Sequence, residues 1–175
     1  MLFKEVMKIQ PAVPEDVPAI ARAQVRSWQA AYERIMPADH LATLSVEKRE
    51  ALWRELLSRS APELLVAKEN DYIIGFIAFG RCRDQDAAAS TAEIWSVYVI
   101  PSHWAQGVGT QLWKQARERM IELGYHSVSL WVLADNTRAT QFYDRIGFDL
   151  DEESAKEVVI GGKTLSEVRY VAQLC

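Results

Sequence analysis

The segment VYVIPSHWAQGVG, residues 97–109, joins an apolar run to a turn that carries two glycines. The apolar run predicts a strand, and the residues after Gly107 predict a helix that Gly124 ends. The apolar face of this helix consists of Val108, Leu112, Ala116, Met120 and Leu123. Because the first turn of a helix leaves backbone N–H groups unpaired, and glycine lets an anion approach them, the segment predicts a pyrophosphate-binding turn.

Glycines also precede helices simply to turn the chain, and the turn alone is equally consistent with that role. A second motif, NTRATQFYDRIGF at residues 136–148, adds independent information. It predicts a short helix that Asn136 caps and Gly147 ends. The apolar face of this second helix consists of Ala139, Phe142, Tyr143 and Ile146.

With both motifs in this order, the chain resembles the GNAT acetyltransferase superfamily. The signatures of that family are a V-x-P strand end before a glycine-bearing turn, and N-x-x-A-x-x-F-Y-x-x-x-G-F, which this sequence contains without a substitution. The segment SWQAAY at residues 27–32 is also similar to the first helices of bacterial members. One departure is Trp104, because much of the family has Gln or Arg three residues before the first glycine.

The order of the predicted elements indicates an α/β fold. Helices are expected from Pro14 to Ile35 and from Ser45 to Arg59. The second helix is expected to bury Leu52, Trp53, Leu56 and Leu57. Strands are expected at 7–10, 64–68, 72–79, 91–100 and 127–133, and in a last hairpin through Gly161 and Gly162.

These segments make a mixed sheet of about seven strands with helices on both faces. The resemblance implies a GNAT-like fold in which two central parallel strands, those that end at Val99 and Val132, splay apart. At 175 residues, 49% of them hydrophobic, the chain is expected to form one domain over residues 1–175.

The resemblance implies that acetyl-CoA is the donor and that its pantetheine arm enters the gap between the splayed strands. The cofactor-binding residues that it implies are Val97, Tyr98, Val99, Trp104, Ala105, Gln106, Gly107, Val108, Gly109, Thr110, Asn136 and Tyr143. Backbone N–H groups at 97–99 would polarise the thioester carbonyl. Since Trp104 replaces the family side chain, we expect backbone amides of the turn to hold the phosphates. Lys114 and Arg138 are further candidates, although charged helix positions are usually only solvated.

Amine acetylation needs a base, because an amine with a pKa near ~10 is almost entirely protonated at neutral pH. The resemblance points to Glu93, which stands eleven residues before Trp104, the spacing of the general base in some members. The alternative is a glutamate paired with solvent or with an arginine. In the ribosomal-protein-acetylating branch the base lies five residues before the motif asparagine, and that position here is Trp131, which cannot accept a proton. A water chain to the backbone is the other route by which the proton could leave.

Tyr143 matches the family tyrosine that donates a proton to the departing CoA thiolate. That pairing is chemically reasonable, since the pKa values of a phenol and a thiol, ~10 and ~8.5, lie close together. The alternative for Tyr143 is a core aromatic on a helix face. Asn136 matches a position that contacts the cofactor arm, and its alternative is a role as a helix cap alone.

Trp28 and Tyr32 are four residues apart on the first helix, and the resemblance places them as substrate-binding residues at the acceptor cleft, with core packing as the equal alternative. The net charge of −4 favours a cationic acceptor, a polyamine first. The acidic run at residues 149–157 either steers such a substrate or forms a solvated loop.

We therefore predict an acetyl-CoA-dependent N-acetyltransferase that acts by direct transfer on a primary amine, which a small molecule or a peptide N-terminus carries. The alternative is a non-catalytic acyl-CoA-binding sensor or interaction module. Neither the acidic charge balance nor the scattered cysteines and histidines indicates a nucleic-acid partner or a bound metal. Residues 1–10 lack the pattern of a signal peptide and no apolar run could span a membrane, so a cytoplasmic location is expected. A homodimer is a further expectation.

Overall fold

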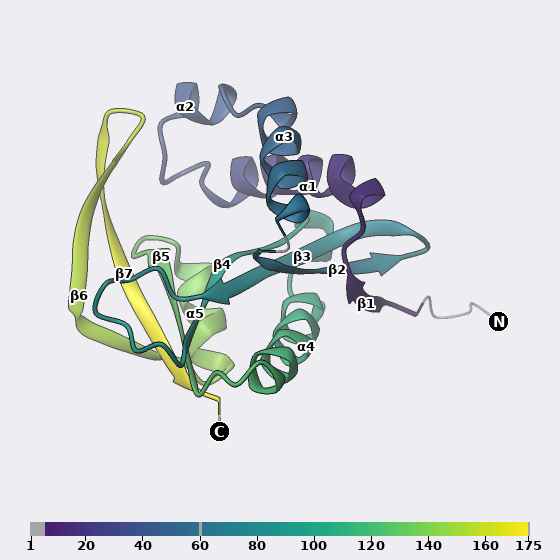
Figure 1. Ribbon diagram of the computed structural model, residues 1–175. Helices are drawn as coiled ribbons and strands as arrows, with labels where there is room; N and C mark the ends of the chain where they lie inside the picture. Colours follow the sequence, from purple (N-terminus) through teal and green to yellow (C-terminus); the bar gives the residue numbers. More distant parts are fainter. Residues whose placement is uncertain (1–5, 60, 175) are drawn as a thin grey trace.

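Seven strands form one mixed sheet in the order β1-β2-β3-β4-β5-β7-β6 in this computed structural model, which describes residues 6–59 and 61–174 (Figure 1). The strands are β1 (Lys8–Pro11), β2 (Glu63–Glu69), β3 (Tyr72–Arg81), β4 (Thr91–Val99), β5 (Ser127–Leu133), β6 (Asp149–Ile160) and β7 (Lys163–Gln173). The predicted mixed sheet is thereby confirmed. The first half of the segment 1–10, on which the location was predicted, lies outside the described residues.

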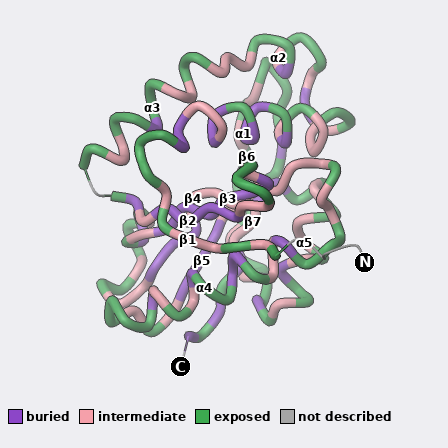
Figure 2. Tube along the Cα trace, turned by 90° about the vertical axis from the view of Figure 1, so that its right-hand side faces the viewer, coloured by how far each residue is buried: buried purple, intermediate pink, exposed green. Residues whose placement is uncertain are grey.

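Helices cover both faces of this sheet. They are α1 (Val17–Ala31), α2 (Ala38–Ala42), α3 (Val46–Ser58), α4 (Val108–Glu122) and α5 (Thr137–Arg145). Two single turns, η1 (Pro14–Asp16) and η2 (Pro101–His103), precede α1 and follow β4. Figure 1 shows α1 and α3 on one side of the sheet and α4 on the other. The buried residues, purple in Figure 2, concentrate in the central strands between these layers.

The two central parallel strands separate along their length. β4 pairs with β5 only at residues 91–93, opposite residues 127–129. Before the separation is complete, β4 also carries a bulge, because Ile94 faces Phe79 while Ser96 faces Ala78, which leaves Trp95 as an extra residue. A bulge increases the local twist of a strand. The predicted splay is confirmed, and it opens a gap at the centre of the sheet.

Several helix and turn positions follow directly from local sequence. Asn70 and Asp71 have positive φ angles of 48° and 64° in the β2–β3 hairpin, as a two-residue turn requires. The hydroxyl of Ser45 accepts a hydrogen bond of 3.2 Å from the backbone N–H of Lys48 at the start of α3. α4 buries four of its five predicted apolar positions, and the fifth, Leu123, is 44% exposed because α4 ends at Glu122.

The predicted core face of α3 is confirmed in part. Trp53 is 4% exposed and donates a hydrogen bond of 2.8 Å to Gln24 of α1, but Leu52 is 40% exposed and Leu56 and Leu57 are half-buried. Leu56 and Leu57 pack with Trp53 against the core that α1, β2 and β3 form, whereas Leu52 lies on the exposed side of the helix. The acidic run at 149–157 is not a loop, because it forms most of strand β6.

Among residues 6–59 and 61–174, no helix is both long enough and apolar enough to cross a bilayer.

Candidate active site

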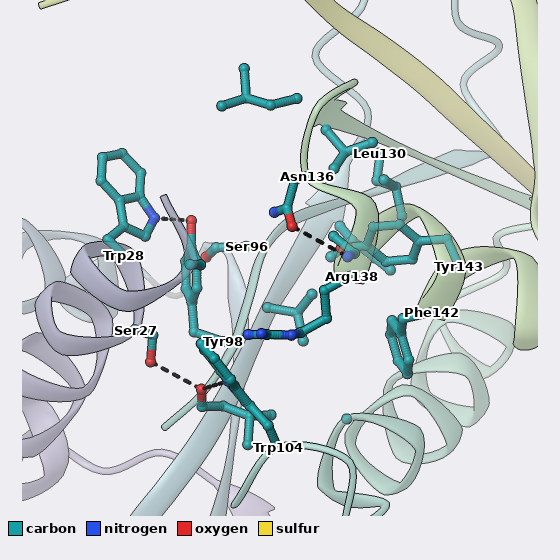
Figure 3. A pocket seen from close by; sticks show the side chains of 18 of the residues that line it. Ser27, Trp28, Ser96, Tyr98, Trp104, Leu130, Asn136, Arg138, Phe142 and Tyr143 are labelled. Carbon is teal, nitrogen blue, oxygen red and sulfur yellow. Dashed lines mark hydrogen bonds between the residues drawn. The ribbon is translucent and has the colours of Figure 1, made fainter. Parts of the chain in front are cut away.

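A cavity of about 410 Å³ lies where β4 and β5 separate. Its walls come from the end of α1, from β4 and the turn after it, from β5, and from α5, with further residues from β6 and β7 (Figure 3). A volume of a few hundred cubic ångströms is typical of small-molecule sites. All of the predicted cofactor- and substrate-binding residues line this cavity except Gln106.

The turn before α4 has the geometry of an anion-binding site. Gly107 is the N-cap of α4 in the left-handed conformation, with φ 84°, and Ala105 has φ 57°. In the part of the chain that the structure describes, the backbone N–H groups of residues 105–110 make no hydrogen bond to another protein group. A Cβ on Gly109 would lie 3.2 Å from Phe142 Cζ, so glycine lets α4 and α5 approach closely. The turn therefore fits the pyrophosphate of a coenzyme A molecule.

Trp104 contributes to this turn through its ring. Its Nε1 donates a hydrogen bond of 2.7 Å to the carbonyl oxygen of Val99, which fixes the indole against β4. The guanidinium carbon of Arg138 lies 3.4 Å from the centroid of the ring, so the planar cation stacks on the indole (Figure 3). A cation thus stands beside the phosphate-binding turn although the family side chain is missing from it.

The unpaired edge of β4 forms another wall of the part of the cavity that would hold acetyl-CoA. Among the described residues, no strand pairs with β4 on the β5 side beyond Glu93, so backbone groups that point that way face the cavity. The carbonyl oxygen of Val99 is one of them, and it accepts hydrogen bonds from Ser27 Oγ, at 3.1 Å, and from the Trp104 indole. Alternate N–H groups of residues 97–99 point the same way and can donate to an acyl carbonyl.

Comparisons with known proteins agree with this geometry. The model of the acetyltransferase (GNAT) family matches residues 22–148. The chain belongs to the GNAT acetyltransferase family. It is 28% identical over 173 residues, 94% of this chain and 97% of the relative, to the uncharacterized N-acetyltransferase YuaI of Bacillus subtilis.

Two further relatives come from Salmonella typhimurium. The L-methionine sulfoximine/L-methionine sulfone acetyltransferase is 27% identical over 123 residues, 70% of this chain and 71% of that protein. The structure of YncA with its cofactor acetyl-CoA is 25% identical and superposes with a TM-score of 0.76 over 97% of this chain and 95% of its own. The predictions of a GNAT fold and of an acetyltransferase that uses acetyl-CoA are confirmed.

Three tyrosines of this GNAT enzyme gather in the cavity wall. Desolvation raises the pKa of Tyr143 and of Tyr98, and it also raises the pKa of Tyr32. The hydroxyl of Tyr98 accepts a hydrogen bond from the indole N–H of Trp28 (Figure 3). Because a raised pKa keeps a phenol protonated at neutral pH, these hydroxyls can donate hydrogen bonds but cannot act as bases, and each is a weaker acid than an exposed phenol.

Asn136 serves both structure and cavity. Its Oδ1 accepts a hydrogen bond of 3.3 Å from the backbone N–H of Ala139, so the predicted helix cap is confirmed. The same side chain lines the cavity and lies close enough to Tyr32 to lower the pKa of that hydroxyl against the larger effect of burial. Its contact with the cofactor stays a prediction.

Glu93 does not join the other predicted site residues. Its side chain is 4% exposed, and Arg83 donates to it from Nε at 3.0 Å, from Nη2 at 2.8 Å and from the backbone N–H at 3.1 Å. It lies where β4 still pairs with Ser129 of β5, and it is not among the residues that line the cavity. This geometry supports the alternative of a glutamate paired with an arginine and gives no support to Glu93 as the general base.

The Arg83–Glu93 contact leads to a prediction about stability. We expect Glu93→Gln to lower the free energy of unfolding by about 1–3 kcal/mol, because charge-assisted hydrogen bonds are lost. Arg83→Gln should cost more, about 3–5 kcal/mol, because it strands a buried carboxylate, whereas the Arg83 side chain is 58% exposed and regains water in the first variant. Urea denaturation of both variants measures the difference. A smaller loss for Arg83→Gln would contradict the assigned pairing.

Glu167 is a cavity residue that sequence reasoning missed. It lies on β7 directly opposite Leu133 of β5, and its side chain is 26% exposed. Leu165 is two residues away on the same face of β7 and is buried. A charged residue at the next position on that face is the sequence feature that could have pointed to a site. That feature points to this cavity only once β7 is known to lie beside β5. Within the described residues no cluster of three or more His, Cys, Asp or Glu side chains could hold a metal ion.

Proposed function

We propose that this GNAT enzyme transfers the acetyl group of acetyl-CoA directly to a primary amine, carried by a small molecule such as an amino-acid-like compound or a polyamine, or by a peptide N-terminus. The observation that carries the proposal is one continuous cavity that runs from the phosphate-binding turn to the aromatic side chains of α1. Donor and acceptor can therefore meet in it without a covalent enzyme intermediate.

The donor side acts through backbone and Tyr143. Acetyl-CoA supplies the acetyl group as a thioester. The N–H groups of residues 97–99 orient and polarise its carbonyl, and those of residues 105–110 hold the pyrophosphate. The hydroxyl of Tyr143, which burial keeps protonated, gives a proton to the sulfur as the C–S bond breaks.

The acceptor side is aromatic. Trp28 and Tyr32 meet edge to face with ring centroids 5.6 Å apart, and Trp28 is 6.3 Å from Tyr98. Rings arranged in this way favour a cation or the apolar part of an amine substrate. The Salmonella typhimurium relative that is named for L-methionine sulfone supports an amino-acid-like acceptor as one member of the class. We further propose a cytoplasmic location and a single domain over residues 1–175.

Thiol release by the purified enzyme tests the proposal. Acetyl-CoA would be presented with amino acids including L-methionine sulfone, polyamines, aminoglycosides and short peptides, and the acetylated product would be identified by mass. We expect saturable release with one class of amine and only slow background hydrolysis without an acceptor. Tight acetyl-CoA binding without release for any amine would contradict the proposal and favour a sensor.

A further inference from the structure

Glu167 is placed to meet the acceptor amine. Of the described residues that line the cavity, it alone carries a carboxylate. Glu93 faces Ser129, whereas Glu167 faces Leu133, four residues further along β5 and so about 13 Å further along the strand. Glu93 thus lies where β4 and β5 are joined, and Glu167 lies where they have separated.

The other titratable groups in the cavity wall do not supply a proton acceptor on the acceptor side. His103 has both ring nitrogens engaged, Nε2 with Glu69 Oε2 at 3.0 Å and Nδ1 with Ser102 Oγ at 2.9 Å. Arg138 and Arg145 are cations. The three tyrosines are protonated at neutral pH, so none of them can accept the first proton of the ammonium group.

The surroundings of Glu167 connect it to the reacting groups. Glu167, Tyr32 and Tyr143 line the same cavity, and the negative charge of Glu167 raises the pKa of Tyr32. Lys156 of β6 is the cation facing it, with Nζ 3.8 Å from Oε2 and also 3.7 Å from the ring centroid of Trp131. On β5 its cross-strand neighbour Leu133 carries no charge.

We propose that Glu167 binds the ammonium group of the acceptor and takes the proton that must leave it before the C–N bond forms. This inference rests on the proposed function, because it names the base and the charge of the substrate for that reaction. The acceptor nitrogen gives one proton to Glu167 and then bonds to the acyl carbon. As the C–S bond breaks, the sulfur takes the proton of the Tyr143 hydroxyl. The nitrogen loses its second proton in the same step, and that proton replaces the one that Tyr143 gave up. The proton on Glu167 returns to water.

The substrate class follows from this assignment. An acceptor that enters as a cation pairs with Glu167 and with the rings of Trp28 and Tyr32, so the enzyme should favour alkyl amines that are protonated at neutral pH. An amine that is already uncharged at neutral pH, such as hydroxylamine, has no ammonium proton for the carboxylate to remove. The two kinds of amine therefore distinguish a base from a residue that only maintains the fold.

The test measures kcat/KM against pH for Glu167→Gln with the panel amine that the wild type acetylates best. We expect about a 100-fold loss at pH 7, within the usual range for a general base. In the variant, kcat/KM should rise tenfold per pH unit toward the pKa of the amine, since only free amine reacts, while the wild type stays nearly flat. With hydroxylamine the two proteins should differ by less than about threefold, and their acetyl-CoA Kd should agree.

Matched variants separate the effect of the Glu167 carboxylate from the effects of its neighbours. Lys156→Met removes the ion pair but keeps Glu167, and Glu157→Gln removes an exposed charge from β6. Glu157→Gln should keep the wild-type pH profile, and Lys156→Met should stay nearly flat around neutral pH because the carboxylate remains. Glu167→Asp should recover part of the activity. A wild-type pH profile in Glu167→Gln, or an equal loss with hydroxylamine, would overturn the inference alone. If the wild type acetylates no amine, the proposed function fails and the inference falls with it.

Discussion

Tyr143→Phe should lower kcat about 100-fold and leave the Kd for acetyl-CoA unchanged. The expected loss is the usual contribution of a positioned acid, because the departing thiolate would have to find its proton in water. The fold should survive the change, since Phe fills nearly the same volume and the ring packs against Phe142 and Phe148 with centroids 5.4 and 5.8 Å away. Single-turnover thiol release and isothermal binding of acetyl-CoA measure the two quantities separately.

Tyr170→Phe is the matched control for this prediction. Tyr170 is also buried, and its ring centroid is 6.0 Å from that of Tyr143, but it does not line the cavity. It should keep the wild-type kcat. Equal kcat values for Tyr143→Phe and the wild type would mean that the thiolate leaves unprotonated or is protonated by water. An equal loss in both tyrosine variants would assign the effect to packing.

The donor half of the site could be predicted from sequence because it is built from local geometry. The positive φ of Gly107, the side-chain cap by Asn136 and the limits of β5 each depend on a few neighbouring residues. Backbone N–H groups at a helix start bind an anion with almost any side chains around them. Two short motifs therefore sufficed to place the turn, the helix after it and the strands beside it.

The proton acceptor could not be predicted in the same way, because it depends on contacts between distant segments. Arg83 reaches Glu93 only because the segment after β3 folds back onto β4, and no spacing rule shows this pairing in the sequence. Glu167 enters the cavity because β7 lies between β5 and β6, out of chain order. A resemblance to a family shows which position of a motif a residue holds, but it does not show which other residue its side chain contacts.

The second large effect is expected at Arg138. Arg138→Met should raise the Kd for acetyl-CoA about 10–100-fold, because a charge-assisted contact to phosphate contributes about 1.5–3 kcal/mol. The guanidinium is held for this contact by its stacking on Trp104, 3.4 Å from the ring centroid, next to the free N–H groups of the turn. Since the lost contact is with phosphate, the Kd or KM for S-acetyl-pantetheine, which lacks the nucleotide, should not change.

Lys114→Met is the control, since Lys114 is an exposed cation on α4 that does not line the cavity, and its acetyl-CoA Kd should match the wild type. Trp104→Leu should show a smaller loss than Arg138→Met, because the cation remains but loses the ring that orients it. Raising the salt concentration should reduce the difference in acetyl-CoA Kd between Arg138→Met and the wild type. If Arg138→Met weakens S-acetyl-pantetheine as much as acetyl-CoA, Arg138 shapes the cavity and does not bind phosphate, and the backbone of the turn then holds the pyrophosphate without a cation.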